Sequence, residues 1–395
     1  MYAFQLGRES KLSLAEIFSV FPHSKIEYAD KNICIIDIEK KQDLLKFLDQ
    51  MGGTIKVIEL FQSYRGKPVD TIIEIAREFE GKFRFGLSFL GSDASLKTLL
   101  MQAKKMLKEE KISGRFINKN FQNLSSAQII GEGLVERQSD FTIISAGKLM
   151  YFGTTIWVQD IEKYSKRDYG KARDMVVGML PPKLAQMMIN ISTSEFVQLK
   201  NSTPTIYDPF CGLGTILIES ILMQNNVVYG SDISAENIEK TKENLNYARK
   251  NFNNSVKTAE AMVLDATGIS SSPYLKKSDF IVTEGYLGQV FLKYSVTEKK
   301  IDEEKVKLLE MYSKFFEGLS RANYTGVIVI SFPFWEVRGK YIYFNEIYEL
   351  IKKYTKNLPL LPSHEEIKHT RSGSLLYKRP DQIVGREIFK LKMKK

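Results

Sequence analysis

Short apolar runs alternate with longer amphipathic segments along the second half of the chain. Apolar, largely β-branched residues predict strands at 205–207, 227–230, 263–264, 280–284 and 326–332. Apolar positions at helical spacing predict helices at 216–222, 234–252, 301–319 and 345–354. Strands that alternate with helices indicate an α/β domain with a mostly parallel sheet. The last two runs, 374–378 and 386–391, have no helix between them and predict a hairpin at the sheet edge.

The first 158 residues predict smaller α+β domains. Residues 1–61 fit a β-α-β-α-β unit of the ferredoxin-like kind, with strands at 1–6, 32–38 and 54–61. Residues 62–158 fit a second domain that ends in a hairpin around Gly147. Residues 159–200 predict a basic linker and a helix that leads into the α/β domain of residues 201–395.

A turn that contains glycine joins the first strand of the α/β domain to its helix. It runs from Asp208 to Thr215 and reads Asp-Pro-Phe-Cys-Gly-Leu-Gly-Thr. Gly212 and Gly214 lack a Cβ, which permits a tight turn and lets a ligand lie against backbone N–H groups. An open α/β sheet binds its ligand at this end of the strands.

Carboxylates at the ends of the strands indicate the kind of ligand. Asp232 follows the second strand, 24 residues after Asp208 (232 − 208), where a doubly wound fold places an acid on a ribose diol. Asp265 and Ala266 follow the third strand, where an adenine edge would lie. The turn lacks the Gly-x-Gly-x-x-Gly spacing, and Asp208 would repel a pyrophosphate. A cationic ligand, S-adenosylmethionine, is therefore favoured over NAD or ATP.

The stretch from Asp208 to Thr215 resembles motif I of the class I methyltransferases, in the form found in RNA base methylases. The resemblance implies a Rossmann-like domain with a mostly parallel seven-stranded sheet, a C-terminal hairpin and S-adenosylmethionine as cofactor. The residues expected to bind the cofactor are Asp208, Pro209, Gly212, Gly214, Thr215, Asp232, Ile233, Asp265 and Ala266.

Composition points to a globular protein with an anionic partner. The net charge is +10 and the sequence pI is about 9.2, which favours nucleic acid. No apolar run reaches the length of a membrane span and no signal peptide stands at the start, so a cytoplasmic protein is expected. The two cysteines and three histidines have no metal-ligand spacing. Cys211 is expected to pack in the turn rather than act as a nucleophile.

Lysine and arginine gather in two stretches before the α/β domain. The cations expected to contact RNA are Lys104, Lys105, Lys119, Lys166, Arg167, Lys171 and Arg173. The alternation of helix and strand in residues 62–158, with Lys and Asn in a late loop, resembles a THUMP domain, an RNA-binding module of enzymes that modify tRNA. The alternative, which stays open here, is that Lys97 to Lys111 is a solvated helix face.

The stretch before the turn carries the most specific resemblance. Arg173-Asp174, followed by Gly-Met-Leu-Pro-Pro-Lys-Leu-Ala at 178–185, resembles the THUMP-linked guanosine-N2 methyltransferases of tRNA, the kind that methylates the guanosine at position 10. Arg371-Ser372-Gly373-Ser374 and Val384-Gly385-Arg386-Glu387 resemble the carboxyl end of that family. The resemblance implies tRNA as partner and N2-methylguanosine as product. It leaves open the number of methyl groups and whether a small activator subunit takes part.

The acceptor site departs from the pattern of base-amine methyltransferases, Asp/Asn-Pro-Pro-Tyr. Alignment on Tyr286 puts Thr283 in the place of the acid, and Glu284 and Gly285 in the place of the prolines. An exocyclic amine needs hydrogen-bond acceptors that aim its nitrogen, and an aromatic ring that stacks on the extruded base. We expect Glu284 as the acceptor, Tyr286 as the stacking ring and Thr283 beside them. The alternative is a site of altered specificity or lost activity, in a turn loosened by the missing prolines.

Three functions are consistent with these sequence features. The first is a tRNA guanine-N2 methyltransferase. The second is an RNA-binding or chaperone protein whose methyltransferase-like domain does not turn over; the retained carboxylates and glycines argue against it. The third is a DNA adenine-N6 methyltransferase, and the long first half, with no DNA-reading helix signature, argues against that.

Overall fold

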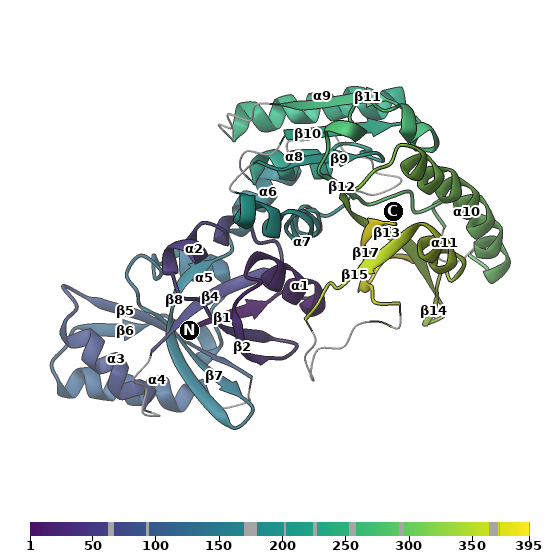
Figure 1. The fold of residues 1–395 in the computed structure, drawn as a ribbon. Coiled ribbons are helices and arrows are strands. Elements are labelled where there is room, and N and C mark those ends of the chain that lie inside the picture. Colours follow the sequence, from purple (N-terminus) through teal and green to yellow (C-terminus); the bar gives the residue numbers. More distant parts are fainter. Residues whose placement is uncertain are drawn as a thin grey trace. The chain divides into compact units, whose positions relative to one another are not determined.

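The computed structural model describes residues 1–61, 67–91, 95–169, 180–200, 203–223, 227–252, 258–291, 296–362, 370 and 372–394 (Figure 1). The chain divides into two compact units. The first comprises Met1–Ser10, His23–Asp49 and Thr54–Ser165, and the second comprises Lys11–Pro22, Gln50–Gly53 and Lys166–Lys395. Helix α1 (Ser10–Val20) therefore groups almost wholly with the second unit, although it precedes most of the first in sequence.

The first unit is built on one sheet. Its strands are β1 (Tyr2–Leu6), β2 (Lys25–Ala29), β3 (Ile33–Asp37), β4 (Thr54–Leu60), β5 (Phe83–Leu90), β6 (Gly114–Phe116), β7 (Asp140–Ala146) and β8 (Leu149–Val158). Among the described residues the strand order is β2-β3-β1-β4-β8-β7-β5-β6. Its helices are α2 (Lys41–Leu45), α3 (Pro68–Arg77), α4 (Leu96–Glu109) and α5 (Ser126–Gly131), with 3-10 turns η1 (Leu48–Gln50) and η2 (Lys119–Phe121).

Strand β2 was not expected, and it completes the first motif. With it the chain order becomes β-α-β-β-α-β, and β2, β3, β1 and β4 pair antiparallel in that order, as in ferredoxin-like folds. The two α+β domains expected from the sequence are continuous in space, because β4 pairs antiparallel with β8. Residues 1–61 and 62–158 thus contribute to a single sheet.

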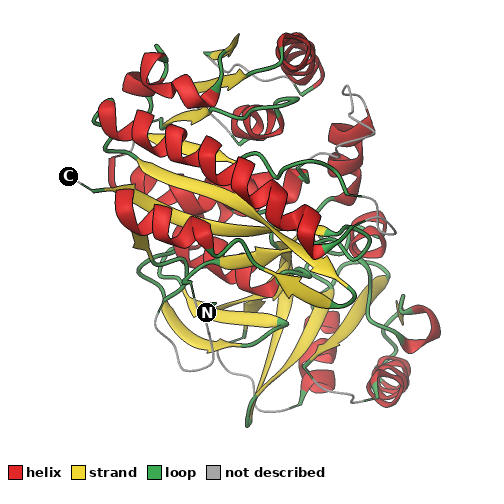
Figure 2. Cartoon of the chain, turned by 90° about the vertical axis from the view of Figure 1, so that its right-hand side faces the viewer, coloured by secondary structure: helices red, strands yellow, loops and turns green. Residues whose placement is uncertain are grey.

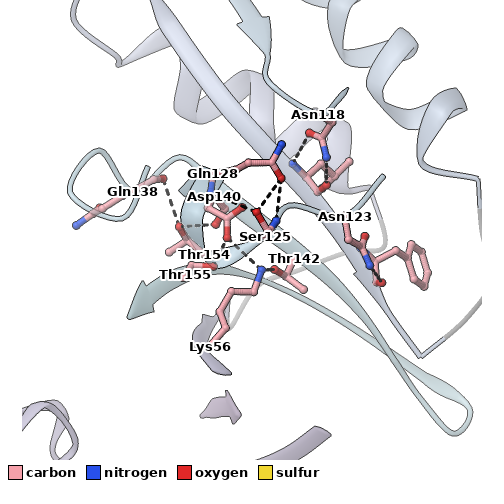
Figure 3. Close-up of polar contacts among 12 residues, drawn as sticks. Lys56, Asn118, Asn123, Ser125, Gln128, Gln138, Asp140, Thr142, Thr154 and Thr155 are labelled. Carbon is pink, nitrogen blue, oxygen red and sulfur yellow. Dashed lines mark hydrogen bonds and ion pairs between the residues drawn. The ribbon is translucent and has the colours of Figure 1, made fainter. Parts of the chain in front are cut away.

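A buried ion pair crosses this junction (Figure 3). Lys56 Nζ lies 3.1 Å from Asp140 Oδ2 and 2.9 Å from Thr142 Oγ1, and Thr155 donates to the same Asp140 oxygen. The side chains of Lys56 and Asp140 are 3% and 0% exposed. The pair therefore joins β4 to β7 and β8 inside the first unit.

Asparagine side chains complete the free edge of β5. Asn118 bonds both the N–H and the C=O of Leu87, and Asn123 bonds both groups of Phe89 (Figure 3). Each amide takes the place of a neighbouring strand where β6 has ended. The loop that carries Lys119 is fixed to the sheet by these contacts.

The second unit has the sheet order of a class I methyltransferase. Its strands are β9 (Thr205–Asp208), β10 (Val227–Asp232), β11 (Ala259–Val263), β12 (Phe280–Thr283), β13 (Val327–Val337), β14 (Lys340–Ile342), β15 (Thr355–Leu358), β16 (Leu375–Tyr377) and β17 (Val384–Met393). In the described residues the main path is β11-β10-β9-β12-β13-β17-β15, with β14 paired to β13 and β16 to β17. The first five strands of this path, β11, β10, β9, β12 and β13, are parallel to one another. β17 runs antiparallel to its neighbours β13 and β15.

Helices cover the strands of this sheet, as the red and yellow elements of Figure 2 show. They are α7 (Pro182–Lys200), α8 (Thr215–Leu222), α9 (Ala235–Asn251), α10 (Glu298–Arg321) and α11 (Glu346–Tyr354), with 3-10 turns η3 (Ala266–Ser271) and η4 (Leu275–Lys277). Helix α6 (Ile161–Tyr169) stands where a linker was expected. The predicted hairpin is formed by β16 and β17, while β15, which the sequence did not predict, forms the outermost strand of the path.

A buried carboxylate fastens α1 into the second unit. Glu16 accepts hydrogen bonds from the backbone N–H groups of Gly52 and Gly53 and from the Asn190 side chain of α7, at 2.7–2.8 Å. Burial raises the pKa of Glu16 to about 7, against the lowering effect of these donors.

No helix in the described residues is long and apolar enough to cross a bilayer.

Candidate active site

The turn after β9 is shaped by its second glycine. Gly214 has φ +84°, immediately before α8, and a Cβ there would lie 2.8 Å from Thr241 Cγ2. A side chain would therefore suffer both backbone strain and a clash. Thr241 also donates from Oγ1 to the Gly212 carbonyl at 2.7 Å, so α9 holds the turn against the sheet.

Asp208 lies at the end of β9 and is 2% exposed. Its Oδ1 accepts from the Phe210 N–H at 3.1 Å. Burial raises the pKa of Asp208 to about 7; the hydrogen bonds from Thr283 and Phe210 lower it, and the charges of Asp232 and Glu284 raise it further. A carboxyl group with this pKa is only partly ionised at neutral pH, and a nearby positive charge, as a cationic ligand would supply, favours its ionised form.

Asp232 lies at the end of β10 and faces the same turn. Its Oδ2 accepts from the Gly212 N–H at 3.0 Å, and its Oδ1 accepts from the Ser234 N–H at 2.9 Å and from Asn237 Nδ2 at 3.1 Å. These donors fix the carboxylate in one orientation. Ser234 in turn caps α9 by accepting from the Asn237 N–H.

One cavity of about 850 Å³ receives most of the residues expected at the site. The expected residues that line it are Asp208, Pro209, Gly212, Thr215, Asp232, Ile233, Asp265, Ala266, Glu284 and Tyr286. Gly214 and Thr283 are not among the lining residues. Gly214 shapes the turn, and Thr283 is fully buried, where it accepts from the Gly285 N–H and hydrogen-bonds Asp208.

The Thr283-Glu284-Gly285-Tyr286 turn is held by contacts that replace the missing prolines. Ser331 of β13 donates to the Glu284 carbonyl, and Tyr312 of α10 donates to the Tyr286 carbonyl at 2.9 Å. Gly285 has φ +72°, and a Cβ there would lie 2.5 Å from the Tyr312 hydroxyl. The turn is thus fixed by its neighbours.

Arg386 is the main site residue that reasoning from the sequence missed. Its Nε donates to Glu284 Oε1 at 2.5 Å, and the two side chains are 6% and 22% exposed. Both residues line the cavity. Arg386 lies in the Val-Gly-Arg-Glu segment singled out by resemblance, but a separation of 102 residues gave no signal that it meets Glu284.

Tyr286 and Cys211 also line the cavity. Tyr286 is 47% exposed, and burial of the phenol, with a contribution from Glu304, raises its pKa, so the phenol stays neutral. Burial also raises the pKa of the Cys211 thiol well above its usual range. Cys211 therefore stays protonated in the turn, in agreement with a packing role. The described residues contain no group of three or more His, Cys, Asp or Glu that could hold a metal ion.

The cations expected to contact RNA have different environments. Lys104, Lys119 and Lys166 are exposed, and Lys105 lies 3.7 Å from Glu109 on α4. Arg167 is mostly buried: its Nη1 lies 2.9 Å from Oε2 of the fully buried Glu219, and its side chain is only 12% exposed. It neutralises a buried acid and is not a free surface cation. Lys171 and Arg173 lie outside the described residues.

A cationic hollow in the first unit was not expected. Its volume is about 610 Å³, and it is lined by Phe79, Glu80, Lys82, Arg84, Arg115 and Arg137. The lining thus contains four cationic side chains and one carboxylate, that of Glu80. Arg84 is paired with Glu132 at 3.0 Å.

The strand order, the glycine turn and the acids at the strand ends define the second unit as a class I methyltransferase domain, whose cofactor is S-adenosylmethionine. Residues 170–293 match the family model of the RMKL-like methyltransferase domain. Over the whole chain the fold is similar to the crystal structure of TrmN from Thermus thermophilus, with a TM-score of 0.50, 15% identity, and coverage of 100% of this chain and 99% of that one.

Two curated relatives match by sequence, and both are named tRNA (guanine(10)-N2)-dimethyltransferase. The protein of Methanothermobacter thermautotrophicus is 40% identical over 88 residues, which is 21% of this chain and 24% of the relative. The protein of Pyrococcus abyssi is 28% identical over 227 residues, which is 54% of this chain and 58% of the relative. The chain thus spans from about a quarter to just under three fifths of these relatives. The predicted fold class and the resemblance to tRNA guanosine-N2 methyltransferases are confirmed.

Proposed function

We propose that this protein is an S-adenosylmethionine-dependent methyltransferase that forms N2-methylguanosine in tRNA, with the guanosine at position 10 as target. The observation that carries the proposal is the single cavity in which Asp208, Asp232 and Glu284 meet at the ends of adjacent strands. The names of the two curated relatives support tRNA as the substrate and guanine N2 as the acceptor.

The three acids of the cofactor site are proposed to contact different parts of the cofactor. Asp232, held by Gly212, Ser234 and Asn237, is placed to accept from the ribose hydroxyls. Asp208 supplies a negative charge for the cationic amino group of the cofactor. Asp265 accepts from the Thr267 N–H at 2.8 Å, which fixes the start of η3 beside the expected adenine position.

The acceptor residues aim the substrate nitrogen. S-adenosylmethionine supplies a methyl group on a sulfonium, which is a good leaving group. Tyr286 stacks on the extruded guanine, and Glu284 accepts from its N2–H, which orients the nitrogen for in-line attack. The new N–C bond forms as the S–C bond breaks, the electron pair of that bond stays on sulfur, and the surplus N2 proton passes to Glu284.

The first unit is proposed to bind the phosphates of the tRNA backbone. Residues 62–158 are proposed as the THUMP-like RNA-binding region, and the hollow of Lys82, Arg84, Arg115 and Arg137 supports this by its excess of positive charge. Exposed Lys104 and Lys119 extend the cationic set. Replacing Arg115 or Arg137 by Ala should weaken binding of tRNA and lower its log–log salt slope by about 1. Lys352→Ala, which removes a cation paired with Glu349 on α11, is the control.

The test is transfer of labelled methyl groups to total tRNA and, in a parallel reaction, to DNA, followed by mass spectrometry of the nucleosides. The proposal expects labelled N2-methylguanosine, and its loss in a tRNA transcript that carries adenosine at position 10. Cofactor binding without any methylated nucleoside would indicate a binding protein without turnover. N6-methyladenosine in DNA would indicate the adenine methyltransferase.

A further inference from the structure

The ion pair between Glu284 and Arg386 has a donor and acceptor pattern of its own. Arg386 donates from Nε to Glu284 Oε1, and its Nη1 lies 3.4 Å from Gln382 Oε1. Within the described residues, Arg386 Nη2 and Glu284 Oε2 have no hydrogen-bond partner. The carboxylate and the guanidinium therefore line the cavity together: Glu284 Oε2 and the second lone pair of Oε1 can still accept, and the Arg386 Nη2 group can still donate.

The neighbours of Arg386 hold the pair in place. The guanidinium carbon lies 5.8 Å from the centre of the Tyr377 ring, and β17 pairs with β13 at Pro333↔Arg386. Glu284 is fixed through its carbonyl by Ser331. A salt bridge of two side chains held on separate elements presents a constant array to a ligand, because neither partner needs to be ordered on binding.

This array matches one edge of one base. The Watson–Crick edge of guanine presents N2–H and N1–H as donors and O6 as an acceptor. Adenine presents an N6–H donor and an N1 lone pair, and cytosine presents an N4–H donor and an N3 lone pair. A carboxylate would accept from both guanine donors but would repel either lone pair, and a neighbouring guanidinium would donate to O6.

We propose that Glu284 and Arg386 act together as the guanine-specificity element of the cavity: the carboxylate reads N1–H and N2–H, and the guanidinium reads O6. The inference rests on the proposed function and deepens it. In this arrangement Glu284 contacts N2, the reacting nitrogen, whereas Arg386 contacts O6 at the other end of the Watson–Crick edge of guanine. The pair therefore selects the base as well as orienting it.

The experiment compares two bases that share the reacting amine. Guanine and 2,6-diaminopurine both carry a 2-amino group, but 2,6-diaminopurine has a lone pair at N1 and an amino group at C6. Ligated tRNAs carry one or the other at the methylated position, found by mass spectrometry with the wild-type protein. We expect the wild type to methylate the guanine tRNA at least about 100-fold faster, since a site that hydrogen-bonds a substrate group rejects analogues without it.

Variants of Arg386 and Glu284 should change the ratio of the methylation rates of the guanine tRNA and the 2,6-diaminopurine tRNA. Arg386→Lys keeps the charge but loses the planar fork, and Arg386→Met and Glu284→Gln remove one side of the array. We expect the guanine preference to fall by about 10-fold or more in each, with an unchanged affinity for S-adenosylmethionine. For a variant without turnover, the two tRNAs are compared by filter binding in the presence of S-adenosylhomocysteine.

The outcomes separate this inference from the proposed function. A wild type that methylates both tRNAs equally, or variants that lose rate and binding without a change in the ratio, would show that the ion pair is only structural. A wild type that methylates no guanosine in tRNA would overturn the proposed function instead.

Discussion

Tyr312 of α10 donates its hydroxyl hydrogen to the backbone carbonyl of Tyr286 at 2.9 Å, so that a helix outside the acceptor turn fixes the residue proposed to stack on the base. The same hydroxyl lies 2.5 Å from where a Cβ of Gly285 would be. The turn can dispense with proline because α10 and β13 supply the rigidity.

Tyr312→Phe should therefore lower the rate of methyl transfer by about 10- to 100-fold, because a small misplacement of reacting groups is costly. Thermal unfolding should change little, since one hydrogen bond contributes about 1 kcal/mol. Tyr324→Phe is the matched control: the Tyr324 hydroxyl is buried with no partner in the described residues, and its removal should leave kcat unchanged. Equal kcat values for the two variants would contradict this role of the turn.

Glu284→Ala should stop methyl transfer and leave S-adenosylmethionine bound, because Glu284 is assigned to the base and not to the cofactor. Its removal leaves the Arg386 guanidinium without a charged partner, so the folded fraction is checked by circular dichroism. Glu336→Gln, which alters a carboxylate paired with Lys378 on the same sheet, serves as the control. Full kcat in Glu284→Ala would show that the catalytic assignment is wrong.

Asp232→Asn should weaken binding of S-adenosylmethionine by about 10- to 100-fold, because hydrogen bonds to a charged group contribute about 1.5–3 kcal/mol. Asn retains one acceptor for the Ser234 N–H but cannot accept from the Gly212 N–H with its amide nitrogen, so the folded fraction is checked by circular dichroism. Glu236→Gln, on the first turn of the same helix and exposed, controls for lost charge. Calorimetric titration measures both, and an unchanged Kd for Asp232→Asn would remove the carboxylate from the cofactor site.

Binding of the cofactor should release protons near neutral pH. Burial raises the pKa of Asp208 to about 7 from the ordinary aspartate value of 3.8. Between these two values the folded protein binds more protons than the unfolded chain, so the contribution of Asp208 to stability falls as the pH rises. A bound cation lowers the pKa again, so affinity should increase as the pH rises toward 7. Calorimetry in buffers of different ionisation enthalpy should detect this release in the wild type and not in Asp208→Asn.

Lys56→Met should destabilise the first unit by about 3–5 kcal/mol, because it leaves Asp140 as an unpaired buried charge. The double replacement of Lys56 and Asp140 by apolar residues should cost less than the single one. Urea unfolding followed by circular dichroism measures both. A cost below about 1 kcal/mol for Lys56→Met would show that the ion pair does not hold β4 to β7.

The sequence predicted the strands that are buried and the turns that carry glycine. β9, β10, β12 and β13 are nearly continuous apolar runs, and the motif from Asp208 to Thr215 fixed the place of the site. The periodic patterns also gave the long helices α9 and α10 to within a few residues.

The missed elements have weak local signals. β2 is an edge strand with exposed alternate positions, and β15 follows α11 without a break and has exposed residues in its middle. α6 carries so many charges that its basic stretch was read as a linker. The pairing of Arg386 with Glu284 depends on β17 lying beside β13, which only the complete sheet determines.

We propose that the methyl donor binds where the acids of β9 and β10 and the turn after β12 meet. Ultraviolet cross-linking of methyl-labelled S-adenosylmethionine to the whole protein, followed by peptide mapping, tests it directly. Saturable label is predicted on peptides that contain residues 208–216, 232–237 or 284–291, and it should be lost in Asp232→Asn. Saturable label on a peptide outside these segments, or label that the variant does not reduce, would show that the methyl donor binds elsewhere.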